Sequence, residues 1–235
     1  MKLRIVQLNF WGLPWPFSVW RKTRLQDLVE FIQNNKPDII NLSEVWFGSD
    51  VEYLELKLKD YHFSHTDFGA LNESGLLTIS KYPIKFKRFI PFNRSELFSR
   101  KGILISECKI NKKTFKIINT HFFHSRKLHK SYVVREQLDR LKNYLDKRVP
   151  TILAGDFNLD YDKIKLPFFK IISKINVPTL NKENRYTHKL FNGLYSINLR
   201  CDLIFSNFKA KILKKEIYKL PLLSDHYLVF SEIMV

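Results

Sequence analysis

The stretch LAGDFNLDYD, residues 153–162, carries an apolar run directly into polar side chains. Residues 151–154 predict a short buried strand that a glycine closes. Asp156 and Asn158 lie two positions apart, so continued strand geometry would point both side chains the same way. The alternative is an Asx turn, in which the two side chains only cap the backbone where the strand ends. The rest of the chain has to decide between these two interpretations.

Around this stretch, helices are interleaved with a larger number of strands. Apolar residues at helical spacing predict helices over residues 21–34, 51–58 and 134–145. Further strands are expected at 3–9, 39–42, 61–66, 75–80, 85–91, 102–110, 114–120, 201–206, 211–218 and 227–233. Neighbouring strands favour antiparallel hairpins, and helix crossovers add parallel pairs. The pattern predicts an α/β fold of two packed, mixed sheets with helices on the outer faces.

The chain has 235 residues, 45% of them hydrophobic, and no linker rich in Gly, Ser or Pro, so one domain over 1–235 is expected. Cys108 and Cys201 lie in apolar runs and are expected to be reduced core residues. No stretch approaches the ~20 apolar residues that span a bilayer, and the strand-like residues 1–9 lack the features of a signal peptide. A complete chain of this kind is expected in the cytoplasm, with peripheral contact to membranes left open.

The most pronounced bulk property is positive charge. Forty Lys and Arg residues against 23 Asp and Glu residues give a net charge of +17. Such a field concentrates polyanions, and both nucleic acid and an anionic membrane surface fit it. The alternative is a lysine-rich, merely solvated surface. Nothing in the sequence suggests a nucleotide cofactor or an obligate protein partner.

Polar groups able to do chemistry recur where the expected strands begin or end. They are Asn9, Glu44, His121, Asp156 with Asn158, Asp202, and the pair Asp225-His226. Each alone has an ordinary explanation as a turn cap, a surface carboxylate or a hydrogen-bonded core histidine. So many coincidences of one type favour a shared site.

Several motifs resemble those of the endonuclease/exonuclease/phosphatase superfamily. They are Gly-Asp-Phe-Asn at 155–158, Ser-Asp-His at 224–226 and Pro-Asp-Ile-Ile-Asn-Leu-Ser-Glu-Val at 37–45, with 8–9, 119–121 and 200–205 in the family's order. The likeness covers nearly the whole chain. It implies a four-layer α/β/β/α sandwich, in agreement with the pattern of elements.

A narrower resemblance is to the neutral sphingomyelinase branch of that family. It rests on Asn-Phe-Trp-Gly-Leu-Pro at 9–14, Glu-Val-Trp at 44–46, and the segments 74–84 and 101–102. Trp-Gly and Glu-Val-Trp also occur in bacterial relatives of unclear substrate. One departure is Ser43, where most relatives have Gln; that position is expected to be structural.

The resemblance implies hydrolysis of a phosphodiester with Mg²⁺, or Mn²⁺ as a substitute, held by oxygen ligands. Glu44 is the implied principal ligand with Asn9 beside it, and Asp225 is implied as a metal-shell or orienting carboxylate. Lys101 either adds a positive contact to the phosphate or is an ordinary surface lysine. The cysteines and scattered histidines show no zinc-like spacing.

His226 is the expected general base, because imidazole titrates near neutral pH. Asp202 would bond its other ring nitrogen, fixing the tautomer and stabilising the imidazolium. Asp156 and Asn158 would position water and phosphate. His121 would donate to a phosphoryl oxygen as charge builds in the transition state.

Two substrate classes stay open. Aromatic residues in the segment 11–17 and Trp20 suit a membrane interface, and a phospholipase C reaction would release phosphocholine from sphingomyelin or a similar lipid. These rings could instead fill core between the first strand and the first helix. A nuclease would use the same catalytic residues, the net charge and base stacking on the aromatics. A non-catalytic binding module would lack a ligand or base, and none is missing.

Overall fold

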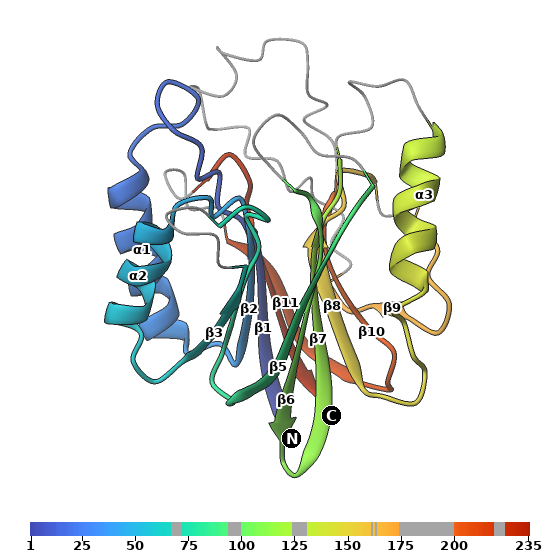
Figure 1. Cartoon of the computed structure of the whole chain (residues 1–235). Helices are drawn as coiled ribbons and strands as arrows, with labels where there is room; N and C mark the ends of the chain where they lie inside the picture. The colour runs from blue at the N-terminus through green and yellow to red at the C-terminus, as the bar shows by residue number, and fades with distance from the viewer. Residues whose placement is uncertain are drawn as a thin grey trace.

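The computed structural model of the chain describes residues 1–66, 72–93, 100–123, 131–160, 162, 164–173, 200–218 and 224–235. Within these ranges two six-stranded sheets pack face to face, with helices on the two outer surfaces (Figure 1). This is the four-layer α/β/β/α sandwich predicted from the sequence. None of the helices in these ranges is long and apolar enough to cross a membrane.

The first sheet has the strand order β11-β12-β1-β2-β4-β3. Its strands are β1 (Lys2–Asn9), β2 (Ile39–Ser43), β3 (His62–His65), β4 (Leu77–Ser80), β11 (Lys211–Tyr218) and β12 (Leu228–Met234). Helices α1 (Arg21–Asn35) and α2 (Gly48–Lys57) cover its outer face (Figure 1). β1 and β2 pair in parallel because α1 carries the chain back between them.

The second sheet has the order β5-β6-β7-β8-β10-β9. Its strands are β5 (Ile84–Pro91), β6 (Gly102–Ile110), β7 (Lys113–His121), β8 (Thr151–Asp156), β9 (Lys170–Ile171) and β10 (Asp202–Ser206). Helix α3 (Ser131–Lys142) lies on its outer face and connects the parallel pair β7 and β8. The sequence pattern missed β9, because its two residues are too few to show any periodicity.

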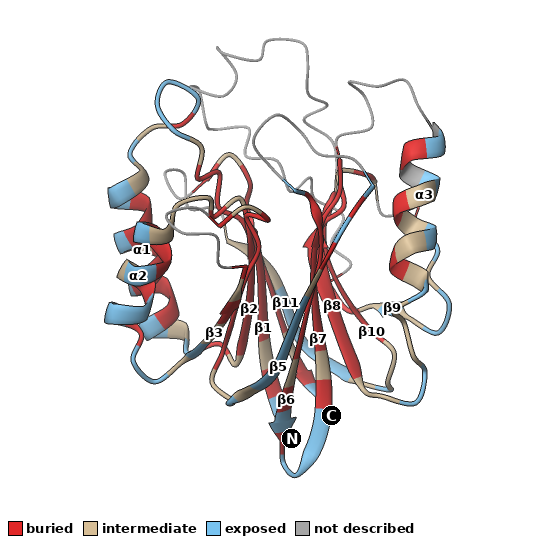
Figure 2. Ribbon diagram, viewed as in Figure 1, coloured by how far each residue is buried: buried red, intermediate tan, exposed pale blue. Residues whose placement is uncertain are grey.

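Alternation along each strand divides its side chains between two hydrophobic layers. On β1, Leu3 and Ile5 pack against the opposite sheet, whereas Val6 and Leu8 pack against the helices. Figure 2 shows the buried residues concentrated in the two sheets and on the inner faces of the helices. Cys108 belongs to the layer between the sheets, and both cysteines are buried free thiols, as predicted.

The layer between the sheets changes from apolar to polar toward one end of the molecule. On β1, Leu3 and Ile5 are followed on the same face by Gln7 and Asn9, all of them buried. The same change occurs along the inward columns Ile39-Asn41-Ser43 of β2, Ile117-Asn119-His121 of β7 and Ile152-Ala154-Asp156 of β8. The register places a buried polar cluster at this end.

Candidate active site

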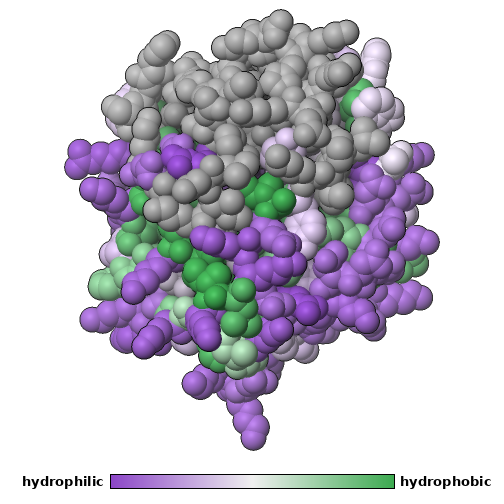
Figure 3. All heavy atoms as spheres, turned by 180° about the vertical axis from the view of Figure 1, so that it is seen from behind, coloured by the Kyte–Doolittle hydropathy of each residue, from purple (hydrophilic) through white to green (hydrophobic). Residues whose placement is uncertain are grey.

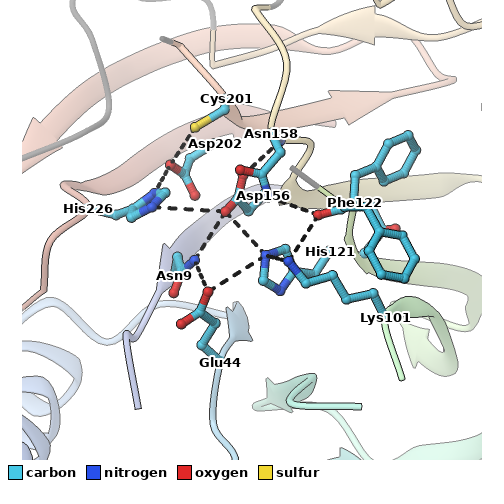
Figure 4. A network of polar contacts seen from close by, with 12 residues as sticks. Asn9, Glu44, Lys101, His121, Phe122, Asp156, Asn158, Cys201, Asp202 and His226 are labelled. Carbon is cyan, nitrogen blue, oxygen red and sulfur yellow. Dashed lines mark hydrogen bonds and ion pairs between the residues drawn. The ribbon is translucent and has the colours of Figure 1, made fainter. Parts of the chain in front are cut away.

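Predicted site residues meet where the strands reach the polar end of this layer. In strand order they are Asn9 at the end of β1, Glu44 after β2, His121 ending β7, Asp156 ending β8 and Asp202 beginning β10. His226 joins them because it lies just before β12, which pairs with β1. Their side chains point toward one another (Figure 4). The site is therefore built from both sheets.

His226 and Asp202 form a buried pair. Nδ1 of His226 lies 2.7 Å from Oδ2 of Asp202, and the two residues are 7% and 1% exposed. Burial opposes the charged imidazolium, but the adjacent Asp202 carboxylate outweighs it and raises the pKa of His226 above its ordinary value. Because Asp202 takes Nδ1, Nε2 is the ring nitrogen turned toward Asp156, at 4.0 Å from Oδ2.

Asp156 is the centre of the network. Its Oδ2 accepts a hydrogen bond from the Asn9 amide at 3.1 Å and lies 3.5 Å from Nε2 of His121. Burial alone would raise the pKa of this carboxyl, but His226 and His121 overcome that effect and lower it to about 2. Asp156 is therefore a carboxylate at any pH near neutrality.

The structure corrects the geometry expected for Asn158. β8 ends at Asp156, and Asn158 has a φ of 50°, so strand geometry does not continue and the alternation argument is wrong here. The Asn158 backbone N–H donates to Oδ1 of Asp156 at 2.8 Å, which is an Asx turn. Its side-chain amide donates to the Phe122 carbonyl at 2.8 Å. The Oδ1 atom of Asp156 thus accepts the hydrogen bond of the turn, and its Oδ2 atom contacts the other residues of the cluster.

Glu44 lies in an unusual backbone conformation beside this cluster. Its φ is 60°, in the left-handed region that non-glycine residues rarely adopt. Oε1 accepts a hydrogen bond from the Asn9 amide at 3.1 Å and lies 3.8 Å from Nε2 of His121. Burial, with a contribution from the nearby charge of Asp225, raises the pKa of Glu44 to about 7.

Lys101 is not a surface residue, so that alternative is wrong. The residue is 5% exposed, and its Nζ lies 3.2 Å from Nε2 of His121 and donates to the Phe122 carbonyl at 3.3 Å. The same Nε2 also faces the carboxylates of Asp156 and Glu44, at 3.5 and 3.8 Å.

Asp225 is half-buried and accepts a hydrogen bond from the Ser224 hydroxyl at 3.3 Å. Burial raises the pKa of its carboxyl, and the charge of Asp156 raises it further. Glu44, Asp156 and Asp225 therefore gather negative charge that the neighbouring cations only partly offset. Oxygen donors with a surplus of negative charge fit Mg²⁺ or Mn²⁺, so these residues suit the ion that the sequence implied.

Three side chains touch the network without having been predicted as part of it. The Gln7 amide lies 3.5 Å from Oδ1 of Asp202, and the Cys201 thiol donates to Oδ2 of the same carboxylate at 3.6 Å. The Ser224 hydroxyl donates to the Asn9 carbonyl. Gln7 could have been predicted, because it lies two positions before Asn9 on β1 and so on the same face of the strand. The apolar residues around Cys201 in the sequence indicated only a core position.

The aromatic segment after Asn9 is divided between core and surface. Trp11 is 3% exposed, so the core alternative holds for it, whereas Trp15 is 81%, Phe17 49% and Trp20 62% exposed. The segment is tied to the site because the Gly12 N–H donates to the Glu44 carbonyl at 2.9 Å.

A buried arginine holds this segment in place. The Arg24 guanidinium donates to the carbonyls of Phe10, Trp11 and Val19 and to the Ser18 hydroxyl. It also stacks on the rings of Phe10 and Trp11, at 5.0 and 4.9 Å from their centroids. The exposed rings therefore lie on a loop that the hydrogen bonds of Arg24 hold in place.

The sequence model of the endonuclease/exonuclease/phosphatase family matches residues 6–226. The chain belongs to this family of hydrolases, and its fold is the family's fold. The resemblance read from the motifs is confirmed.

Curated relatives come from the sphingomyelinase branch. A Drosophila melanogaster protein, provisionally named a neutral sphingomyelinase, is 27% identical over 94% of this chain and 56% of its own length. Human "Sphingomyelin phosphodiesterase 2" is 37% identical over 36% of this chain and 20% of its own length. The chain thus spans little more than half of the fly protein, and the segment of it that matches the human protein spans a fifth of that protein.

Solved structures agree in fold at low sequence identity. Danio rerio TDP2, in a complex with a single-strand DNA product, superposes with a TM-score of 0.78 at 17% identity, covering 100% of this chain and 99% of that one. SmcL superposes with a TM-score of 0.76 at 19% identity and the same coverage.

Proposed function

We propose that this chain is a divalent-metal-dependent phosphodiesterase in which His226 activates the attacking water. The observation that carries the proposal is that the two ring nitrogens of the buried His226 face different carboxylates. Asp202 holds Nδ1 of His226 at 2.7 Å, and Nε2 faces Asp156 at 4.0 Å. A base oriented by a carboxylate and aimed at a second polar group is the arrangement that general-base hydrolysis needs.

In the proposed reaction, Nε2 of His226 accepts a proton from water as the water oxygen attacks phosphorus. Asp202 keeps the ring in the required tautomer and stabilises the imidazolium that forms. Asp156, ionised through its low pKa, accepts a hydrogen bond from the same water and fixes its direction. The bond from phosphorus to the leaving oxygen breaks, that oxygen takes a proton from solvent, and the His226 imidazolium returns its proton to solvent.

The negative charge of the phosphate would be neutralised on the side of the network away from His226. Glu44, Asn9 and Asp225 would hold Mg²⁺ or Mn²⁺, which supplies charge neutralisation of the phosphate and stabilisation of the leaving oxygen. The Lys101 ammonium, which contacts His121 and the Phe122 carbonyl, would donate to a phosphoryl oxygen. His121, whose Nε2 lies between this ammonium and Asp156, would donate to a phosphoryl oxygen as charge builds in the transition state.

For the substrate, we propose a sphingomyelin-type phospholipid cleaved in a phospholipase C reaction. Two observations support it: the fly relative that aligns over 94% of this chain, and the exposed rings of Trp15, Phe17 and Trp20 in the segment that follows Asn9. Tryptophan and phenylalanine suit the boundary between head groups and acyl chains.

A nuclease is the second candidate. The net charge of +17 and the single-strand DNA product bound to the TDP2 structure favour it. The surface seen from behind is largely hydrophilic, with a smaller hydrophobic area among the described residues (Figure 3). The positive net charge suits an anionic membrane as well as a nucleic acid.

One parallel assay with Mg²⁺ separates the candidates. Phosphocholine release from sphingomyelin vesicles is scored beside nicking of plasmid DNA and decay of RNA, with EDTA and His226→Ala as controls. Lipid cleavage abolished by both controls is expected. Nucleic-acid cleavage under the same controls would reassign the substrate, and turnover unaffected by His226→Ala would refute the mechanism.

The exposed loop supplies a second test of the lipid substrate. Trp15→Ser combined with Phe17→Ser should reduce sphingomyelin hydrolysis in vesicles far more than hydrolysis of a small soluble diester. Phe168→Ser is the matched control, because Phe168 is 62% exposed elsewhere on the surface. Equal losses on both substrates would indicate that the loop rings act on the catalytic site rather than on the lipid.

A further inference from the structure

We propose that Asp156, Cys201 and His226 form a second cation site, which binds zinc and stops hydrolysis when it is occupied. One ligand atom from each residue lies within 4.8 Å of the others, and the three residues are 1%, 1% and 7% exposed. Zinc binding follows from the side chains alone. The loss of activity rests on the proposed role of His226 as the base.

The donor set distinguishes this cluster from the magnesium site. A carboxylate oxygen, a thiolate sulfur and an imidazole nitrogen are the three ligand types that Zn²⁺ takes in proteins. Mg²⁺ prefers oxygen ligands and keeps several waters. The two ions are therefore expected to separate, with magnesium on the Glu44 side and zinc at the thiol.

The orientation of His226 supports a metal at Nε2. Asp202 binds Nδ1 at 2.7 Å, so the lone pair of Nε2 points toward Asp156. Histidines that ligate metals almost always have the other ring nitrogen on a carboxylate or carbonyl, which fixes the ring and makes it a better ligand. Asp202 is already in that position.

The local charge also favours a dication. The Cys201 thiol donates to Oδ2 of Asp202 at 3.6 Å, and the ionised Asp156 lies in the same cluster. Zinc binding releases the thiol proton to solvent, and the sulfur remains as a thiolate bonded to the metal. The bound ion then offsets the negative charge of two buried carboxylates.

Sequence spacing could not show this site. Its ligands come from the end of β8, the residue before β10 and the segment before β12. Antiparallel pairing brings the first two together, and the packing of the two sheets brings His226 to them. Zinc at Nε2 uses the lone pair that would take the proton from water. Inhibition should therefore persist at saturating Mg²⁺, because the two ions do not share Cys201.

The test compares the wild-type protein with Cys201→Ser and Cys108→Ser, all saturated with Mg²⁺. Cys108 is the matched control because it is an equally buried cysteine in the core between the sheets. Equilibrium dialysis should show one zinc bound per chain, and Cys201→Ser should weaken that binding at least tenfold while Cys108→Ser leaves it unchanged. The zinc concentration that halves hydrolysis, measured for each variant against its own zinc-free rate, should follow the same order.

Cobalt provides a readout independent of activity and of variant folding. Co²⁺ added to the Mg²⁺-saturated wild-type protein should give a near-ultraviolet band from sulfur-to-cobalt charge transfer, and zinc should remove it. Absence of that band would overturn the proposal, as would equal zinc affinity in Cys201→Ser, which would point to a surface pair such as His65 and Glu55, 3.9 Å apart. A chain that binds zinc at Cys201 but hydrolyses no phosphodiester would refute the proposed function and leave the metal site standing.

Discussion

Replacing Glu44 with Gln should stabilise the metal-free protein while removing its response to magnesium. The carboxyl of Glu44 is buried, which raises its pKa to about 7. A carboxyl with a raised pKa in the folded state stabilises the fold at low pH, and this contribution is lost as pH rises through that pKa. The loss falls between pH 4.5, the ordinary value, and about 7. Glutamine keeps the oxygen that accepts from Asn9 but has no charge to bury.

The size of the effect follows from the two pKa values. At about 1.4 kcal/mol for each pH unit between 4.5 and about 7, ionisation of Glu44 costs about 3 kcal/mol above neutrality. The side chain is 17% exposed, so water screens part of that cost and about 2 kcal/mol remains. For a chain of this length, that corresponds to roughly 4–8 °C in Tm.

Thermal unfolding in EDTA at pH 5 and pH 8 measures this directly. The Tm of Glu44→Gln should exceed that of the wild type only slightly at pH 5 and by the full amount at pH 8. Adding Mg²⁺ at pH 8, at 100 times its Kd, should raise the free energy of unfolding of the wild type by about 2.7 kcal/mol, and its Tm accordingly. The Tm of the variant should rise much less. Hydrolysis by the variant should be lost.

Glu107→Gln is the control, because Glu107 is a half-buried glutamate on β6, toward the end of the strand opposite Lys101. It should reproduce the wild-type response to Mg²⁺. A Tm difference between Glu44→Gln and wild type that is the same at both pH values would refute the argument from buried charge. An undiminished magnesium effect in that variant would remove Glu44 from the metal site.

Three further variants test the roles proposed for the other side chains. His226→Gln should lower kcat by about 10²–10⁴-fold and retain the Mg²⁺-dependent rise in Tm, which stopped-assay rates and calorimetry check. Asp202→Asn should cost up to about 10⁴-fold in kcat. Because the Asp202 carboxylate raises the pKa of His226, the acid limb of its kcat/KM profile should move to lower pH. Lys101→Met should lower kcat/KM by about 10²-fold. It should also move the pH-dependent loss of stability above pH 7, because the ammonium lowers the pKa of Glu44.

The sequence predicts the layers and the position of the site because both depend on strand periodicity. Apolar residues at 3 and 5 of β1, followed by Gln7 and Asn9 on the same face, describe a strand whose buried column becomes polar at one end. When several strands share that change, their polar ends meet if the pairing register brings those ends to the same edge of the sheets. The meeting of Asn9, Glu44 and Asp156 follows from local pattern and register together.

Features set by contacts between distant segments could not be predicted. Asn158 leaves strand geometry in a local Asx turn, which the sequence offered as the alternative, but the binding of its amide to the Phe122 carbonyl, after a different strand, could not be predicted. Trp11 is buried and Trp15 exposed because Arg24, on the following helix, binds the carbonyls of the first part of the loop. Composition treats both tryptophans alike, and only the packing separates them.

Glu44 shows how the fold and the site are coupled. Its φ of 60° belongs to a region that costs a non-glycine residue about 1–3 kcal/mol, and its ionised carboxyl is buried at a further cost. Glycine would relieve both terms, since it adopts this φ freely and carries no charge. In this strained conformation the Glu44 carbonyl accepts a hydrogen bond from the Gly12 N–H, and the side chain accepts one from the Asn9 amide. Because Glu44 destabilises the fold in two independent ways where strands from both sheets meet, we infer that a requirement for function, the proposed metal binding, outweighs stability at this residue. The same reasoning makes Glu44→Gly a variant that should gain stability at pH 8 and lose both magnesium binding and hydrolysis.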